Sequence, residues 1–232
     1  MKEGLLNFLA LMGWSFGENK EIFTIEEMIE NFSFDKISLG GPVFDLVKLG
    51  WVNNHHMRLK DLDELTKLAI PYFVKAGYYA DENLSDEEFS KLRRIVEISR
   101  EGAHTLKELP EISSIYFEDE FELPVVEEGM NKKARKSVER LRNSLETEVG
   151  KKSIELFVEK INALNEEISE EEAKEILHGL QDELGEGPAA VLMPLRAVVT
   201  GKARGADLYT VIAAIGKERT LKRVQNTLEK IK

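Results

Sequence analysis

Hydrophobic residues recur along the chain at intervals of three and four, the spacing that places them on one side of an α-helix. The clearest stripe follows Ser85, and a similar stripe at the start of the chain is closed by Gly13. The two stripes comprise Phe89, Leu92, Ile95, Val96 and Ile98, and Leu5, Leu6, Leu9 and Met12. No stretch shows the sustained alternation of apolar and polar residues that indicates a strand. The pattern predicts an all-α protein built from a few packed bundles.

Helix starts are marked by Ser or Thr followed three residues later by Glu, the spacing in which each side chain bonds the other residue's backbone amide. This capping-box spacing occurs four times, at Thr24–Glu27, Ser85–Glu88, Thr105–Glu108 and Ser169–Glu172. Pro42 is expected to begin a further helix that presents Val43, Leu46 and Val47 on one side. The acidic run 118–129 contains Pro124 and Gly129, so it is expected to be a linker between helical units.

Between position 191 and the end of the chain, glycines separate three predicted helices. Pro194 is expected to begin the first helix and Gly201 to end it. A loop of residues 202–206 follows, Asp207 caps the second helix, and Gly216 ends that helix before a last one of residues 217–232. The residues expected to face inward are Leu195, Val198, Val199, Leu208, Val211, Ile212, Ile215, Leu221, Val224, Leu228 and Ile231. Arg196 is expected to point away from this apolar side into solvent.

Charge divides the chain unevenly. The whole chain carries a net charge of −11, yet residues 191–232 alone carry +6 and the remainder −17. A second basic cluster comprises Lys132, Lys133, Arg135, Lys136, Arg140 and Arg142, opposed only by Glu139. One reading is a pair of solvated helical faces. The other is a polyanion-binding surface on an otherwise acidic chain, and two clusters favour nucleic acid modestly.

Candidate chemistry is sparse. The absence of cysteine excludes disulfides, thiolate metal sites and a cysteine nucleophile. The sequence contains no phosphate loop, no Gly-x-Gly-x-x-Gly turn and no Gly-x-Ser-x-Gly elbow. His55 and His56 are adjacent, point in different directions on a helix and lack a carboxylate at ligand spacing, so a structural role is favoured over a metal site. We therefore expect no catalytic residue, no metal and no cofactor in this chain.

Composition is that of a folded protein, with 42% hydrophobic and 32% charged residues. No apolar run is long enough to cross a bilayer, and the first residues lack a signal-peptide pattern. We expect a soluble, cytoplasmic protein without a membrane partner.

Four segments resemble, in the same order, segments of bacterial-type glutamyl-tRNA synthetases, which are class I aminoacyl-tRNA synthetases. The segments are "EGLLNFLALMGWSFGENKEIFTIEEMIENF", "VFDLVKLGWVNNHHMR", "LKELPEISSIYF" and "MPLRAVVTGKARGADLYTVIAAIGKERTLKRV". The resemblance implies an all-α fold with a helical stem-contact region at residues 1–67. Two anticodon-binding helical subdomains, residues 68–117 and 118–232, would follow as an α-helix cage.

The catalytic half of that family carries a His-Ile-Gly-His-like motif and a Lys-Met-Ser-Lys-Ser-like loop, and neither occurs here. The first matching segment falls directly after the usual place of the second motif. The resemblance therefore implies the C-terminal, tRNA-binding half of a glutamate–tRNA ligase. We expect its partners to be tRNA-Glu and the catalytic half of the synthetase. Because ATP and Mg²⁺ serve the parent enzyme, we expect this chain to be inactive alone.

The resemblance also implies which residues meet the anticodon. In the family, the Arg of Pro-Leu-Arg and the Leu that begins the next helix contact anticodon bases, and these match Arg196 and Leu208. The loop between them is expected beside the same bases. The implied contacts are Arg196, Lys202, Arg204, Gly205 and Leu208 for the anticodon, with Lys132, Lys133 and Arg135 as further tRNA contacts.

Gly102 occupies a position of special interest. Family members that accept only glutamate tRNA carry an Arg two residues after another Arg, and this chain has Gly102 two residues after Arg100. An Arg offers only donors, which suit the acceptors of cytosine and oppose the N–H donors of guanine at the third anticodon base. A glycine removes that opposition and implies that tRNA-Gln is also accepted. A second reading, compatible with the first, is a helix C-cap.

An alternative belongs to another class of function. The chain could be a protein-docking module that assembles with a tRNA-dependent amidotransferase, which would correct mischarged glutamine tRNA. This alternative depends on the interpretation of Gly102, because an amidotransferase partner is expected only if tRNA-Gln is accepted.

Overall fold

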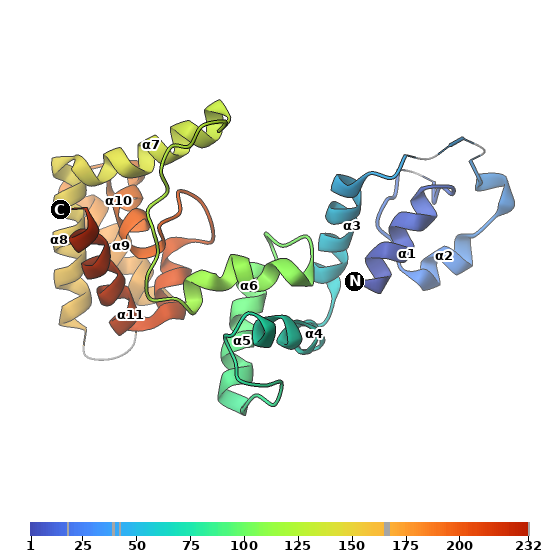
Figure 1. Cartoon of the computed structure of the whole chain (residues 1–232), viewed down its shortest axis with the longest axis horizontal. Helices are drawn as coiled ribbons and strands as arrows, with labels where there is room; N and C mark the ends of the chain where they lie inside the picture. Colours follow the sequence, from blue (N-terminus) through green and yellow to red (C-terminus); the bar gives the residue numbers. More distant parts are fainter. Residues whose placement is uncertain (18, 39, 42, 165–167, 232) are drawn as a thin grey trace. The chain divides into compact units, whose positions relative to one another are not determined.

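The structure is a computed structural model that describes residues 1–17, 19–38, 40–41, 43–164 and 168–231. Within these ranges the regular elements are helices, and one isolated β-bridge joins Trp14 to Ile37. The predicted all-α class is confirmed. The chain forms two compact units, Met1–Ser114 and Ile115–Lys232 (Figure 1).

The first unit places α1 against α3 and α4 against α5 and α6. Its elements are α1 Lys2–Leu11, α2 Ile25–Asn31, η1 Phe34–Lys36, α3 Leu46–Leu59, α4 Leu62–Lys75, α5 Asp86–Ser99, η2 Leu106–Glu108, α6 Leu109–Ile112 and η3 Ser113–Tyr116, the last of which crosses into the second unit. Fully buried side chains from α3, α4 and α5 form the core, among them Met57, Leu65, Phe73, Leu92 and Val96.

Three of the four predicted capping boxes form, at Thr24, Ser85 and Ser169. The box predicted at Thr105 is wrong. There the Glu108 carboxylate accepts from the His104 backbone N–H (2.9 Å) and the Thr105 hydroxyl (2.9 Å), while residues 106–108 wind as a 3₁₀ turn. The tighter turn brings Glu108 back to the amide one residue before the expected cap.

The helix expected from Pro42 begins later. Pro42 itself lies outside the described residues, and α3 starts at Leu46, where the Asp45 carboxylate accepts from the backbone N–H groups of Val47 (2.8 Å) and Lys48 (3.2 Å). Val43 therefore lies ahead of the helix. The side chain of Asp45 satisfies two amides that would otherwise lack partners, which is why the helix begins there.

The described part of the second unit is a bundle of five helices around α10. The helices are α7 Lys132–Glu146, α8 Glu148–Ala163, α9 Glu170–Leu184, α10 Pro188–Thr200 and α11 Leu208–Lys230. The central helix contacts each of the other four (Figure 1). It buries Val191, Leu195, Val198 and Val199 completely. Its last turn, residues 197–200, is buried, whereas Pro188 and Ala189 at its start are exposed.

One predicted helix boundary in this unit is wrong, because α10 begins at Pro188, so Pro194 lies inside it and does not start it. The boundary predicted at Gly216 is confirmed: its backbone is not helical, with φ of 79° and ψ of 172°, and it divides α11 into two helical segments that meet at a kink. The inward residues are mostly confirmed, although Leu221 and Leu228 are only half-buried and Ile231 is 40% exposed.

Candidate nucleic-acid interface

The loop 202–206, called the recognition loop below, joins α10 to α11. It follows Gly201, which ends α10 as predicted. The φ of Gly201 is 65°, a left-handed conformation that favours glycine. The Thr200 hydroxyl donates to Arg196 O (2.8 Å) and accepts from the Lys202 backbone N–H (3.0 Å). Lys202, Arg204 and Gly205 are exposed. The start of the loop is therefore fixed to α10, while its basic side chains face solvent.

Arg196 holds the far end of the same loop. Its Nη2 donates to Ala206 O at 2.8 Å, and its Nη1 would lie 3.7 Å from a β-carbon placed on Gly205. The expectation that Arg196 is a solvent-exposed residue is wrong, because the side chain is half-buried and burial lowers the pKa of its guanidinium. An arginine stays charged at neutral pH in spite of such a shift. Among the described residues no carboxylate forms an ion pair with it, and the nearby charge of Asp207 only partly offsets the effect of burial on its pKa.

Leu208 begins α11, as predicted, after Asp207 at the N-cap position. The Asp207 side chain makes no capping bond and instead accepts from the Tyr209 hydroxyl (2.7 Å). Leu208 is only 4% exposed. Its side chain therefore packs in the core below the recognition loop, where it anchors the start of α11.

The basic last helix is covered by an acidic segment. Residues 118–122, called the acidic strap below, belong to the predicted linker: they lie in the non-helical stretch between η3 and α7, but they pack on α11, which was not foreseen. Asp119 bonds both Arg219 (Nε to Oδ1, 2.7 Å) and Lys222 (Nζ to Oδ2, 2.8 Å), and Lys230 bonds Glu122 (2.9 Å). The hydrogen bonds from Lys222 and Arg219 hold the pKa of Asp119 below its ordinary value. Much of the positive charge of α11 is therefore neutralised within the unit.

Arg223 anchors the strap from below. It is 1% exposed, donates to Val199 O (2.8 Å) and to Glu118 O, and lies 5.2 Å from the centre of the Phe121 ring. Burial lowers the pKa of Arg223 to about 10, which still leaves it charged at neutral pH. The Phe121 ring in turn packs on Gly201, where a β-carbon would overlap it. One buried cation thus joins the strap, α10 and α11.

Helix α7 presents basic residues without such a cover. Val138, Leu141 and Leu145 face the bundle, and the side chain of Asn131 caps the helix through the Ala134 N–H (2.9 Å). Its exposed cations form no ion pair within the described part of the chain: Lys132, Lys133, Arg135, Lys136 and Arg140. No acidic residue lies in the first turn. Cations there oppose the helix dipole, so this end of α7 favours an external anion.

Gly102 lies in the first unit, in a turn held by two asparagines of α3. Asn54 Nδ2 donates to Arg100 O (2.9 Å) and Ala103 O (2.7 Å), and Asn53 Nδ2 donates to His104 O (2.6 Å). The C-cap interpretation of Gly102 is wrong, since the C-cap of α5 is Arg100 and the φ of Gly102 is not positive. The nearest atom to an added β-carbon would be Ser99 O at 4.0 Å. The position is exposed and open to a side chain.

Residues 64–228 match the family model described as an anticodon binding domain. The chain belongs to this anticodon-binding family. It is 58% identical over 231 residues to the glutamate–tRNA ligase of Fusobacterium nucleatum, covering 99% of this chain and 45% of that protein. It is 35% identical over 229 residues to the glutamate–tRNA ligase of Thermus thermophilus, covering 98% and 44%.

A crystal structure of a glutamate tRNA ligase from Elizabethkingia meningosepticum superposes on 99% of this chain with a TM-score of 0.72 at 27% identity. The chain covers 41% of that protein. It therefore spans less than half the length of these relatives and corresponds to their C-terminal half.

In this anticodon-binding chain, the described residues hold no group of three potential metal ligands and no helix long and apolar enough to cross a membrane. His55 Nδ1 lies 3.1 Å from Trp51 O. His56 is buried, with Nε2 2.9 Å from Asn7 Oδ1. Both histidines thus make local contacts, as the structural interpretation predicts.

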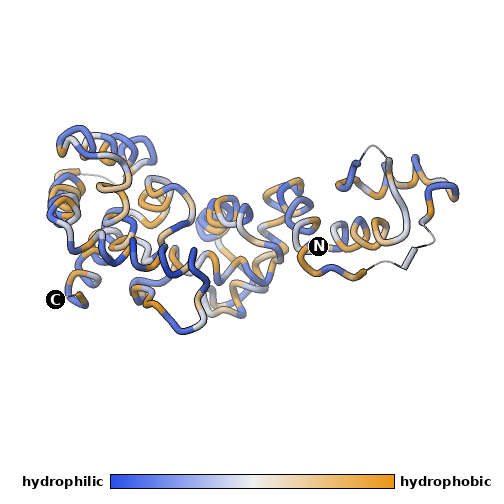
Figure 2. The backbone as a smooth tube through the Cα atoms, turned by 90° about the horizontal axis from the view of Figure 1, so that it is seen from above, coloured by the Kyte–Doolittle hydropathy of each residue, from blue (hydrophilic) through white to orange (hydrophobic). Residues whose placement is uncertain are grey.

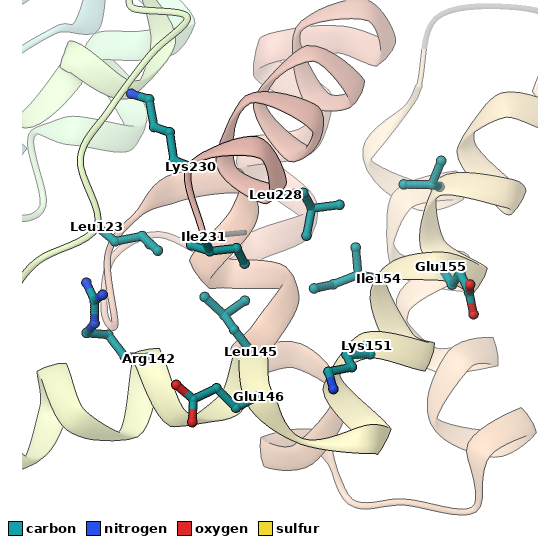
Figure 3. Close-up of a pocket in the computed structure, with 11 residues that line it drawn as sticks. Leu123, Arg142, Leu145, Glu146, Lys151, Ile154, Glu155, Leu228, Lys230 and Ile231 are labelled. Carbon is teal, nitrogen blue, oxygen red and sulfur yellow. The ribbon is translucent and has the colours of Figure 1, made fainter.

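A pocket of about 780 Å³ lies between α7, α8 and the end of α11 (Figure 3). Its walls are largely apolar, and its charged rim includes Arg142, Glu146 and Lys151. It shares no residue with the recognition loop. The anticodon-binding prediction therefore concerns an exposed loop and a helix surface, not this cavity.

Sequence reasoning missed Asn53, Asn54 and the acidic strap. The asparagines carried a signal, since two adjacent amides that directly follow the apolar residues Trp51 and Val52 in a helix need partners if they are buried. The acidic strap also carried a signal in the sequence, because the aromatic residue Phe121 interrupts its run of acidic residues.

Proposed function

We propose that this chain binds tRNA-Glu as the anticodon-binding part of a glutamate–tRNA ligase. The observation that carries the proposal is the half-buried Arg196, a charged guanidinium without a carboxylate partner among the described residues. A cation in that environment is costly unless an anion or a set of acceptors completes it. Family membership supports an anticodon stem-loop as the ligand.

The two basic surfaces of the second unit would have different tasks. Arg196 and the recognition loop present donors beside an exposed glycine, where an unstacked base can approach the backbone. The first turn of α7 presents Lys132, Lys133 and Arg135, which suit phosphate oxygens. The loop would then select bases, and α7 would supply affinity that depends on salt.

The test is a titration of tRNA-Glu with the parent chain and with Arg196→Ala at one fixed salt concentration. We expect a loss of about 1–3 kcal/mol, the usual effect of removing a charged hydrogen bond to RNA. Arg196→Gln keeps a neutral amide donor on a shorter side chain and removes the charge, so its comparison with Arg196→Ala separates the loss of the guanidinium from the loss of all side-chain hydrogen bonding. Lys222→Ala is the matched control, because that cation already pairs with Asp119. Unchanged binding by both Arg196 variants, with the fold intact, would refute the assigned role.

We further propose that tRNA-Gln is accepted, because Gly102 stands where restrictive relatives are expected to carry an arginine. The parent chain should bind the two tRNAs with similar affinity. Gly102→Arg should then favour a cytosine third anticodon base by about 1–3 kcal/mol. The position is exposed, its φ is ordinary and a β-carbon meets nothing closer than 4.0 Å, so the variant should melt like the parent. A parent that already prefers tRNA-Glu tenfold would contradict this proposal.

We expect the chain alone to form no glutamyl-adenylate, since it lacks both ATP-binding motifs of the parent family. ATP and Mg²⁺ would act with the catalytic half. Exchange of pyrophosphate into ATP that depends on glutamate, above a control without protein, would contradict this expectation.

A further inference from the structure

The position of the recognition loop depends on the residue that precedes it. Gly201 is buried and has a φ of 65°, whereas Lys202, Arg204 and Gly205 after it are exposed. The direction in which the backbone leaves Gly201 therefore decides where the exposed part of the loop lies. A contact that fixes Gly201 acts on all the basic side chains that follow.

The acidic strap supplies such a contact through its one hydrophobic side chain. The helices carry both hydrophilic and hydrophobic residues (Figure 2), whereas residues 118–122 are acidic except for Phe121. The Phe121 ring lies directly on the backbone of Gly201, because a β-carbon placed on that glycine would overlap the ring. Glycine at position 201 therefore meets two needs, a positive φ and room for an aromatic ring.

The Phe121 ring is fixed from a second side by a buried cation. The guanidinium of Arg223 lies 5.2 Å from the centre of the ring, an arrangement in which a cation and an aromatic face attract. The same guanidinium donates to Val199 O (2.8 Å), just before Gly201, and to Glu118 O, at the start of the strap. Arg223 thus binds both of the segments that meet at the contact between the ring and the glycine.

The recognition loop is therefore supported at both ends. Arg196 holds the far end, through the 2.8 Å hydrogen bond from its Nη2 to Ala206 O. Phe121 holds the near end, at Gly201. A ring that only covered the core would pack on side chains of the bundle, whereas this ring packs on the backbone at the point where α10 becomes the loop.

We propose that Phe121 is a positioning residue for the recognition loop, so that the acidic strap takes part in anticodon recognition. This inference rests on the proposed function of the loop. Phe121 contacts no base itself and acts through Gly201. Without the ring, the loop samples positions in which Lys202 and Arg204 no longer face the same ligand as Arg196. A loop that is already ordered loses less conformational entropy on binding, so the ring raises the affinity for RNA.

The first experiment measures the loop without RNA. The chain has no cysteine, so Ala203→Cys provides a single attachment point for a nitroxide spin label in the middle of the loop. In Phe121→Ala, the rotational correlation time of the label should fall at least about twofold in the electron paramagnetic resonance spectrum. Phe121→Tyr keeps the ring and should give the parent spectrum. The matched control is Val125→Ala, an exposed hydrophobic residue of the same segment, which should leave the spectrum unchanged.

The second experiment is a titration of tRNA-Glu at one fixed salt concentration. Phe121→Ala should weaken binding about tenfold, while Phe121→Tyr stays within about twofold of the parent. The same change is then made in Lys202→Ala/Arg204→Ala, whose loop has lost its cations. There Phe121→Ala should weaken binding by less than about twofold, because the side chains through which it acts are gone. If Phe121→Ala does not fold, Phe121→Leu takes its place in both experiments.

Three results would overturn the proposal: an unchanged label in Phe121→Ala, a more mobile label with unchanged tRNA binding, or an equally large loss of binding in the loop that lacks its cations. The last result would show that Phe121 acts elsewhere in the unit. A parent chain that binds no tRNA would contradict the proposed function and the link to the anticodon. The label would still show separately whether Phe121 supports the loop.

Discussion

Helices α7 and α11 are both rich in Lys and Arg, yet their charges are used differently. The cations of α11 pair with the acidic strap, through Asp119 and Glu122, and one of them is buried. The exposed cations of α7 named above form no ion pair in the described part of the chain. A count of basic residues therefore does not show which of them are available to bind an external anion. Pairing with the strap therefore leaves α7, more than the last helix, with exposed cations that an external anion can reach.

The strap is held by its buried contacts more than by its ion pairs. Lys222 and Lys230 are 59% and 38% exposed, and pairs at such positions contribute about 0.2–1 kcal/mol each. Arg223 is different, because two backbone carbonyls lose their donor if it is removed. The comparison of α7 with α11 thus predicts that mutations in the two helices affect different properties.

The largest effect is expected for Arg223→Ala. Removing this side chain leaves Val199 O and Glu118 O without their donor and opens a gap beneath Phe121, so the free energy of unfolding should fall by about 3 kcal/mol. Lys222→Ala, the exposed neighbour on the same helix, should change it by no more than about 0.5 kcal/mol. Urea titrations of the two variants measure the difference. Similar losses in both would show that exposed ion pairs, and not Arg223, hold the strap.

The strap shows which parts of the fold a sequence can reveal. Helix α5 and the core of α11 were predicted because local apolar spacing decides them. The pairing of Asp119 with Arg219 joins residues 100 positions apart, and no local pattern reports such a contact. An acidic run with a proline therefore indicated a linker. The first apolar stripe misled for another reason, since Leu5, Leu6 and Leu9 are exposed in the described part of the chain.

The candidate site was predictable in position more than in geometry. Resemblance placed Arg196 and Leu208 on either side of one loop, and the structure has Arg196 in α10, before the loop, and Leu208 at the start of α11, after it. Their burial could not be foreseen, because it depends on how α10 and α11 pack. The predicted domain boundaries, acceptance of tRNA-Gln and docking with an amidotransferase stay predictions.

The next largest effect concerns tRNA binding by α7. Lys132→Ala/Lys133→Ala/Arg135→Ala should remove up to three phosphate contacts, each of which changes the slope of log K against log salt by about 0.7–0.9. The slope should become shallower by about 2, and affinity at 0.1 M salt should fall roughly tenfold to a hundredfold. Lys222→Ala/Lys230→Ala on α11 is the control and should leave the slope unchanged. Equal changes of the salt slope in both variants would show that the cations of α7 and α11 contribute alike to tRNA binding, against the difference expected between the two helices.

The smallest effect is the pH dependence of the strap. Hydrogen bonds from Lys222 and Arg219 lower the folded pKa of Asp119 below its unfolded value. Its stabilising contribution is therefore complete above the unfolded pKa of about 3.9 and is lost as pH falls through the folded value. Because the side chain is 37% exposed, Asp119→Asn should cost only about 0.5 kcal/mol at pH 7, and less in 1 M salt. The difference in unfolding free energy between parent and variant should shrink as pH falls below the unfolded pKa and vanish once Asp119 is protonated in the folded state. A difference that persists there would mean that Asp119 acts through the shape of the strap and not through its charge.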